Sequence, residues 1–307
     1  MNAIPLLPLA LALPFLTPPA AGGRAPQGER GEQEGPAQEV DEARREVKRL
    51  EAWPGVADED QVELDVERLR KARTEEMGVQ AREALLDAGA GVAPYLLPVL
   101  GREEDEDTRR RIVAVLDGVT GPAHTRLLAR EFGAGAAPLR RWCLLRVARF
   151  PDPGVRAAAQ EALARATKAR KPDPEDVYAA SLCALSAGSL AGFDAVAARA
   201  EKHWGACAPE VRTALESVRG VEATLRVAPM LAEESRLRRV CGLNLLAGCG
   251  ERETAVRLVA PFLDDSDNSL RVAAINALRG IVDGDPPIEK LAVFDAIERA
   301  AKWKQRL

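Results

Sequence analysis

Residues 252–281 read RETAVRLVAPFLDDSDNSLRVAAINALRGI, and this stretch decides the fold. It opens with an apolar-periodic segment that ends in a Pro-Phe-Leu triplet at 261–263, and an acidic turn follows. A second segment begins after Asp267, and its apolar residues recur three and four positions apart, at Ala274, Ile275 and Leu278. That spacing places them on one face of an α-helix. The stretch therefore predicts two short helices joined by a turn.

The same phrase occurs at two earlier places, in residues 92–119 and 220–248. In all three copies a Pro-apolar-Leu triplet stands about ten residues before an arginine, and a leucine follows that arginine by seven. Pro229 and Pro261 are 32 residues apart, and the 131 residues between Pro98 and Pro229 are close to four further repeats of that length. Self-similarity at such a period is the signature of a repeat architecture.

Weaker copies fill the gap between the clear ones, at 124–132, 139–150, 154–166, 176–188, 190–204 and 209–220. Residues 154–166 have the arginine-to-leucine spacing of a second helix, from Arg156 to Leu163, yet they directly follow another second helix. The pairing of helices between 150 and 207 therefore stays open, and a spare helix or a degenerate repeat would account for it.

A short helix pair exposes one apolar stripe on each helix and cannot bury both alone, so each pair needs the next one. The Asp and Ser residues before the second helices are suited to cap free N–H groups and to complement the helix dipole. Helix-favouring Ala, Leu, Arg and Glu dominate, while runs typical of strands are nearly absent. We expect an all-α fold, an α-solenoid of stacked antiparallel helix pairs.

These phrases resemble the HEAT-repeat family, and in particular the short bacterial variety also called PBS-lyase HEAT-like repeats. The resemblance rests on DDSDNSLRVAAINALRGI at 264–281, on GVRAAAQEALARA at 154–166, and on the prolines of the first helices, and it covers roughly residues 79–283. It implies a ladder in which an arginine of one second helix pairs with an aspartate of a neighbouring turn. The residues at matching positions are Arg109, Arg140, Arg238 and Arg271, with Asp107 and Asp267; no aspartate precedes Arg140.

The N-terminal part divides into three segments before the repeats. Residues 1–23 have an apolar stretch followed by small residues, as in a secretory signal, although no Lys or Arg precedes the stretch. Residues 24–37 are rich in Gly, Pro, Glu and Gln and predict a flexible linker. Residues 38–78 predict charged amphipathic helices that form an N-terminal cap, with a short coiled-coil arm as the alternative. Residues 79–307 then form the repeats, and a final helix at 288–307 caps them.

Sites for chemistry are scarce in this sequence. It has two histidines, His124 and His203, and five widely spaced cysteines without a C-x-x-C pair. We interpret the cysteines as small core residues. A calcium loop starting at Asp265 would need Gly and Glu where the chain has Leu270 and Asn276, so the acidic turn is interpreted as a helix cap. The sequence predicts no catalytic residue, no cofactor and no metal.

The leading hypothesis is therefore a non-enzymatic scaffold that binds a protein or peptide partner. One alternative is an enzyme or enzyme accessory like the bilin lyases, which the resemblance brings in. The other is a nucleic-acid binder that uses a basic track of arginines at the starts of the second helices: Arg109, Arg110, Arg111, Arg140, Arg141, Arg236, Arg238 and Arg239. The net charge of −4 does not favour nucleic acid. We expect export to the periplasm or outside the cell, with no membrane span after signal removal, or a cytoplasmic protein if residues 1–23 are not a signal.

Overall fold

The computed structural model describes residues 51–307, and these residues are all-helical. The predicted signal at 1–23, the linker at 24–37 and the start of the predicted cap lie outside the described residues and stay predictions. Residues 51–307 contain no β-strand, and one isolated parallel bridge joins Gly220 to Gly250.

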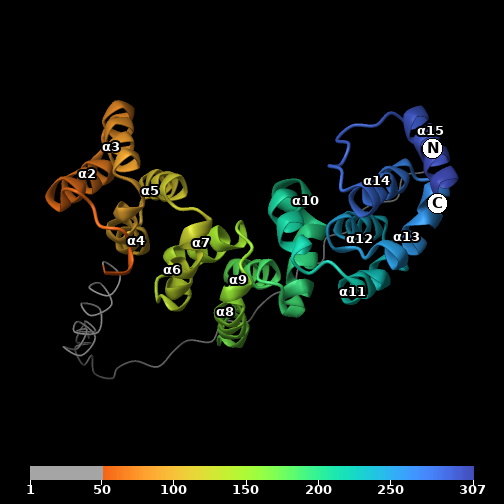
Figure 1. The fold of residues 1–307 in the computed structure, drawn as a ribbon, viewed down its shortest axis with the longest axis horizontal. Coiled ribbons are helices and arrows are strands. Elements are labelled where there is room, and N and C mark those ends of the chain that lie inside the picture. Colours follow the sequence, from red (N-terminus) through yellow and green to blue (C-terminus); the bar gives the residue numbers. More distant parts are fainter. Residues whose placement is uncertain (1–50) are drawn as a thin grey trace, which may run out of the picture. The chain divides into compact units, whose positions relative to one another are not determined.

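Short helices follow one another along the whole described chain (Figure 1). Their bounds are α2 (Glu59–Lys71), α3 (Glu75–Ala88), α4 (Ala93–Arg102), α5 (Glu106–Val119), α6 (Thr125–Ala129), α7 (Ala137–Ala148), α8 (Arg156–Lys168), α9 (Pro174–Ser186), α10 (Phe193–Glu216), α11 (Val221–Leu231), α12 (Arg236–Cys249), α13 (Arg252–Val259), α14 (Asn268–Leu278) and α15 (Val293–Arg306). Single 3₁₀ turns extend several of them, including η3 (Arg130–Gly133) after α6 and η6 (Ala260–Asp264) after α13.

The helices pack in pairs, and each pair packs on its neighbours in sequence. The pairs are α2 with α3, α4 with α5, α6 with α7, α8 with α9, α11 with α12, and α13 with α14. The second helices also pack directly on each other, α7 on α9 and α12 on α14, while α10 lies between α9 and α12. The last helix, α15, packs on α14 and η6. Each helix pair therefore packs on the next pair along the sequence.

The structure resolves the pairing that the sequence left open between 150 and 207. α8 contains residues 156–168 and is the first member of a pair, because it packs on η3 of the preceding pair and on α9 of its own. Its arginine-to-leucine spacing therefore does not mark a second helix. The backbone of His203 leaves the helical region (φ −136°, ψ 32°), so α10 consists of two helical segments. These two segments of α10 occupy the place of a helix pair between α8–α9 and α11–α12.

One apolar core runs through all the pairs, from Trp53 to Trp303. Small residues allow close helix contact: a Cβ atom on Gly280 would lie 2.6 Å from the carbonyl oxygen of Ala247 in α12. All five cysteines are buried and none forms a disulfide, which agrees with their interpretation as core residues. Burial raises the pKa of Cys183 to about 12.

The predicted side-chain caps are present at the starts of α5, α12 and α14, whereas α7 has Ala136 at its N-cap and no side-chain cap. The carboxylate of Asp105 accepts a hydrogen bond from the Thr108 amide at 2.7 Å at the start of α5. The Ser235 hydroxyl accepts one from the amide of Arg238 at 3.3 Å, and Asp267 accepts one from the amide of Ser269 at 2.7 Å. Each cap satisfies an N–H group that the first helical turn leaves unpaired.

One stretch of the described chain, Glu75–Arg102, is long and apolar enough to cross a membrane by length and composition alone. It comprises α3 and α4, which are separated by a 3₁₀ turn that starts at Gly89 (φ 74°). Leu85, Leu96 and Leu97 of this stretch are fully buried in the core. The apolar character of the stretch is thus that of core helices.

Candidate functional site

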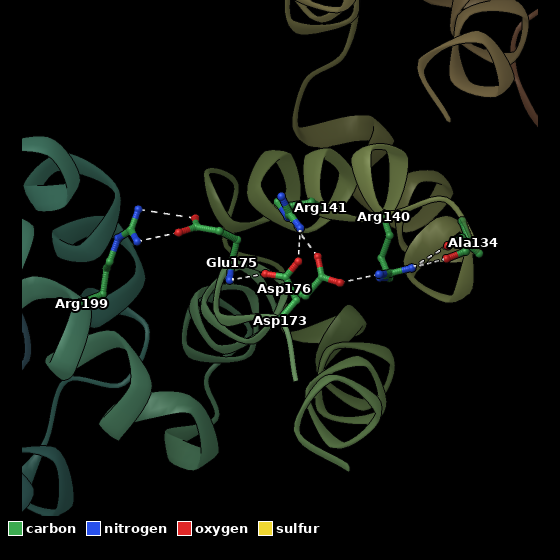
Figure 2. Close-up of polar contacts among 8 residues, drawn as sticks. Ala134, Arg140, Arg141, Asp173, Glu175, Asp176 and Arg199 are labelled. Carbon is green, nitrogen blue, oxygen red and sulfur yellow. Dashed lines mark hydrogen bonds and ion pairs between the residues drawn. The ribbon is translucent and has the colours of Figure 1, made fainter. Parts of the chain in front are cut away.

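A polar network joins α7 to α9. Arg141 of α7 reaches Asp176 with its Nε (3.0 Å) and Asp173 with its Nη2 (3.0 Å). Arg140, the preceding residue, donates to the other oxygen of Asp176. Figure 2 shows both guanidinium groups converging on the two carboxylates at the start of α9. Two adjacent arginines of the helix pair α6–α7 are therefore neutralised by two aspartates of the helix pair α8–α9.

The local sequence explains why both aspartates face α7. Asp173 is the N-cap of α9 and accepts a hydrogen bond from the amide of Glu175 at 2.9 Å, and Pro174 follows it at the first helical position. Asp176 stands three residues after Asp173, so the two carboxylates lie on the same side of the first turn. The amide of Glu175 contributes most to lowering the pKa of Asp173, and Arg141 lowers it further. The positive end of the helix dipole also favours acidic side chains here.

The network continues from α9 into α10. Glu175 binds Arg199 of α10 through two contacts, at 2.7 and 3.4 Å (Figure 2). The Arg199 guanidinium also lies over the ring of Tyr178, 5.3 Å from its centroid. The Tyr178 hydroxyl donates to Glu210, in the second segment of α10, at 2.5 Å. Burial, and then the hydrogen bond to this carboxylate, raise the pKa of Tyr178 well above its usual value. Polar contacts thus connect three successive helix pairs.

A second set of ion pairs joins α12 to the turn before α14. Arg236 reaches Asp267 at 3.4 Å, and Arg239 lies 3.8 Å from Asp265. The hydroxyl of Ser269, and then its amide, lower the pKa of Asp267 to about 2. The pairing repeats the relation seen between α7 and α9, with an arginine early in one second helix and an aspartate at the start of the next.

Three of the four predicted arginines share a different contact, which lies within their own helix pairs. Arg109, Arg140 and Arg271 each donate to the backbone carbonyl six residues earlier, at Glu103 (2.8 Å), Ala134 (2.7 Å) and Asp265 (2.7 Å). Each side chain thus closes the turn before its own helix. This common geometry explains why an arginine recurs at this position of the repeat phrase.

The six predicted residues do not pair with one another. Arg238 binds Glu233 of its own turn at 2.8 Å and lies 3.7 Å from Glu201. Asp107 binds Arg110 within α5. Asp267 accepts from Arg236 instead of the expected arginine of the phrase. Of the predicted arginines, Arg140 forms the ion pair to the following pair of helices, although no aspartate precedes it in sequence.

Sequence reasoning missed the partners on α9 and α10. Asp176 begins the segment 176–188, which was interpreted only as a weak copy, and Asp173 and Glu175 lie just before that segment. An acidic run with a proline before an apolar stretch is nevertheless a helix-start signal. No local signal identifies Arg199 or Glu210, because their partners are 24 and 32 residues away. His124, for which the sequence offered no partner, stacks on Trp53 with 5.3 Å between ring centroids.

A buried arginine reinforces the contact between the pairs α4–α5 and α6–α7. Arg146 of α7 donates to the Thr120 hydroxyl at 3.0 Å and to the carbonyl of Asp117 at 2.6 Å, both at the end of α5. Its guanidinium lies 4.8 Å from the ring centroid of Phe150. Burial lowers the pKa of Arg146. The carbonyl groups that α5 leaves unpaired at its end are thereby satisfied from the next pair.

The chemistry of this network is that of helix-to-helix fixation. Its carboxylates accept from arginines or backbone amides, and its tyrosine hydroxyl is held by Glu210. Within residues 51–307, no group of three or more His, Cys, Asp or Glu side chains is arranged to hold a metal ion.

No protein-family model and no curated protein matches this chain. Among solved structures, it is similar to a crystal structure of an engineered protein with 16% identity and a TM-score of 0.38, covering 78% of this chain and 71% of the other. A second engineered protein matches with 16% identity and a TM-score of 0.24, covering 80% of this chain and 88% of the other. Likeness of this degree supports no inference about family or function.

Proposed function

We propose that the chain is an α-solenoid of HEAT-like helix pairs that acts as a non-enzymatic scaffold for a protein or peptide partner. The observation that carries the proposal is the packing order: each pair packs on the pairs beside it in sequence, from α2 to α15. Stacked pairs of this kind present extended rows of side chains, and such rows are binding surfaces in repeat proteins.

The polar contacts between pairs support the same proposal. Arg140 with Asp176 and Arg236 with Asp267 use carboxylates at helix starts, where the helix dipole favours them. They fix one pair against the next and leave no arrangement of nucleophile, base and orienting group among themselves. The arginines at the starts of α7 and α12 are paired with acids, which does not favour a continuous basic track for nucleic acid.

The proposed location is the periplasm or the outside of the cell. It rests on the apolar stretch and the small residues within 1–23 of the sequence. N-terminal sequencing of the protein isolated from its own cells tests this directly. A mature chain that starts near residue 24 supports export, whereas an intact Met1 in a cytoplasmic fraction contradicts it.

The scaffold proposal is tested by partner capture followed by reconstitution. The mature chain is immobilised and incubated with the native envelope fraction, and the retained proteins are identified by mass spectrometry. A genuine partner, once purified, binds the chain in solution with a measurable Kd and a fixed stoichiometry. If the purified chain instead converts a metabolite, and one side-chain substitution abolishes that turnover without unfolding it, the proposal is wrong.

A further inference from the structure

A groove of about 480 Å³ lies where the pair α8–α9 meets the turn between α10 and α11. One wall comes from Arg156 and Gln160 of α8 with the turn after α9, and the other from residues 218–222. The same helices follow one another in Figure 1. None of the ion pairs described above enters this groove, and it is distinct from the network at the starts of α7 and α9.

Two arginines of the groove are held by neutral groups. Arg156 donates through Nε to the carbonyl of Ala187 at 2.9 Å, and Arg219 donates through Nε to the carbonyl of Gly248 at 3.1 Å. Neither arginine forms an ion pair with a carboxylate of residues 51–307. Their orientation is thus fixed by backbone, while their charge stays uncompensated. Arg219 also donates through Nη2 to the carbonyl of Ala247 at 3.4 Å. The remaining N–H groups of the two guanidinium groups can bind a carboxylate through charge-assisted hydrogen bonds.

A buried hydroxyl in the groove also has a spare donor. Ser189 lines the groove and is only 7% exposed. Its oxygen accepts from Gln160 at 2.9 Å and from the amide of Ala191 at 3.4 Å. Both contacts use the oxygen as acceptor, so the hydroxyl hydrogen has no acceptor among the described residues. A hydroxyl that accepts in this way can still donate its hydrogen to an anionic ligand in the groove.

The apolar part of the groove continues onto an exposed helix face. Leu190, Val218 and Val221 line the groove, and Val221 is 51% exposed. Leu225, one helical turn further along α11, is 57% exposed. A ligand that reached from the arginines to Leu225 would need both an acidic group and an apolar side chain along an extended chain. This combination fits a peptide better than a small anion.

We infer that this groove binds an acidic peptide segment of a partner protein, with carboxylates at Arg156 and Arg219 and an apolar side chain against Val221 and Leu225. The inference rests on the proposed scaffold function and names the chemistry of the partner. Glu222 is the one carboxylate that lines the groove. It opposes an acidic ligand, and its removal is therefore expected to strengthen binding.

The test is fluorescence anisotropy of labelled peptides with the full chain at low ionic strength. The parent peptide is Gly-Asp-Leu-Asp-Ser-Leu-Asp-Gly; one comparison peptide has Asn for Asp, and another has Ser for Leu. Both comparison peptides are expected to bind at least about tenfold more weakly, because charge-assisted hydrogen bonds and apolar burial are each of the size that changes Kd by that factor. Added salt is expected to weaken the binding of the parent peptide.

Substitutions of opposite sign locate the binding. The double variant Arg156→Gln with Arg219→Gln is expected to raise the Kd of the parent peptide by at least about tenfold. Glu222→Gln is expected to lower that Kd a few fold. Arg257→Gln is the matched control, because Arg257 is exposed and pairs only with Glu253 on α13. Thermal unfolding followed by circular dichroism checks the fold of each variant. If the double variant does not fold, Glu222→Gln still decides, and an unchanged Kd in that variant overturns the inference.

Other results would also overturn it. Equal binding of the three peptides, or no effect of the double variant when it is folded, removes the groove as a peptide site. If inorganic phosphate displaces the parent peptide and the Ser-for-Leu peptide binds equally well, the groove is a small-anion site instead. A captured partner that binds the folded double variant normally leaves the scaffold proposal intact and this inference wrong. Failure of every partner to bind in solution ends the scaffold proposal independently of the peptides.

Discussion

Replacing Asp176 by alanine is expected to loosen the contact between α7 and α9. The side chains of Arg140 and Asp176 retain 22% and 12% exposure, so their pairing is only partly open to solvent. The substitution leaves Arg140 without its carboxylate and Arg141 with Asp173 alone. Losing charged hydrogen bonds at a partly buried site costs about 2 kcal/mol of the free energy of unfolding. In a unit of this size, that loss lowers Tm by about 4–8 °C.

Urea unfolding followed by circular dichroism measures this change, and hydrogen exchange locates it. Faster exchange is expected in α7 and α9, with little change in α14, because α7 and α9 pack on each other and α14 packs on α12 and α15. Asp107→Ala is the matched control, since Asp107 pairs only with Arg110 inside α5 and both side chains are 71% exposed. Its cost should be below about 0.5 kcal/mol. If Asp176→Ala is no less stable than this control, the pairing does not hold the two pairs together.

Three further predictions follow from single contacts. Asp267 has a folded pKa of about 2 against an ordinary value of 3.8, so the stability it contributes is present above pH 3.8 and is lost as the pH falls toward 2. Urea unfolding across this pH range should therefore show a weaker acid dependence for Asp267→Asn than for the wild type. Equal pH dependence of the two proteins would contradict the assignment. Gly280→Ala is expected to destabilise the fold by about 1–3 kcal/mol, since its Cβ would lie 2.6 Å from the backbone oxygen of Ala247. At Gly205 an added Cβ meets nothing within 4 Å, so Gly205→Ala should be neutral or stabilising. The same urea assay compares the two variants, and equal effects would refute the close contact. The five cysteines are buried, and burial raises the pKa of Cys183, Cys241 and Cys249 to about 12. A thiol reagent should therefore label the cysteines only after denaturant is added. Rapid labelling of the native chain would contradict this packing.

The repeat phrase predicted the second helices and their starts because both depend on neighbouring residues. Asp267 and Ser235 were interpreted as caps from their place before an apolar period, and both accept from amides two or three residues on. The same reasoning left residues 154–166 undecided, because their arginine-to-leucine spacing is that of a second helix while they directly follow another one. First and second helices carry similar apolar stripes, so only contact with the adjoining pairs shows that α8 is a first helix.

The ion pairs between helix pairs each include a residue other than those named for the ladder from the sequence. A ladder between arginines and aspartates was expected, and ion pairs of that type join α7 to α9 and α12 to α14. Arg109, Arg140 and Arg271 share a contact to the carbonyl six residues earlier, whereas Arg238 pairs with Glu233. Long arginine side chains reach several acceptors, so position in the phrase does not select the partner.

By itself, the sequence determined that the described chain consists of short amphipathic helices with capped starts, because periodicity and capping act over one or two helical turns. Only the tertiary structure decided which helices form a pair, that Arg140 meets Asp176, and that Arg156 and Arg219 line one groove. Arg140 and Asp176 are 36 residues apart, and Arg219 is 29 residues from Gly248, whose carbonyl orients it. Contacts over such separations depend on the register at which one helix pair settles on the next, and that register is set by the packing of the whole core.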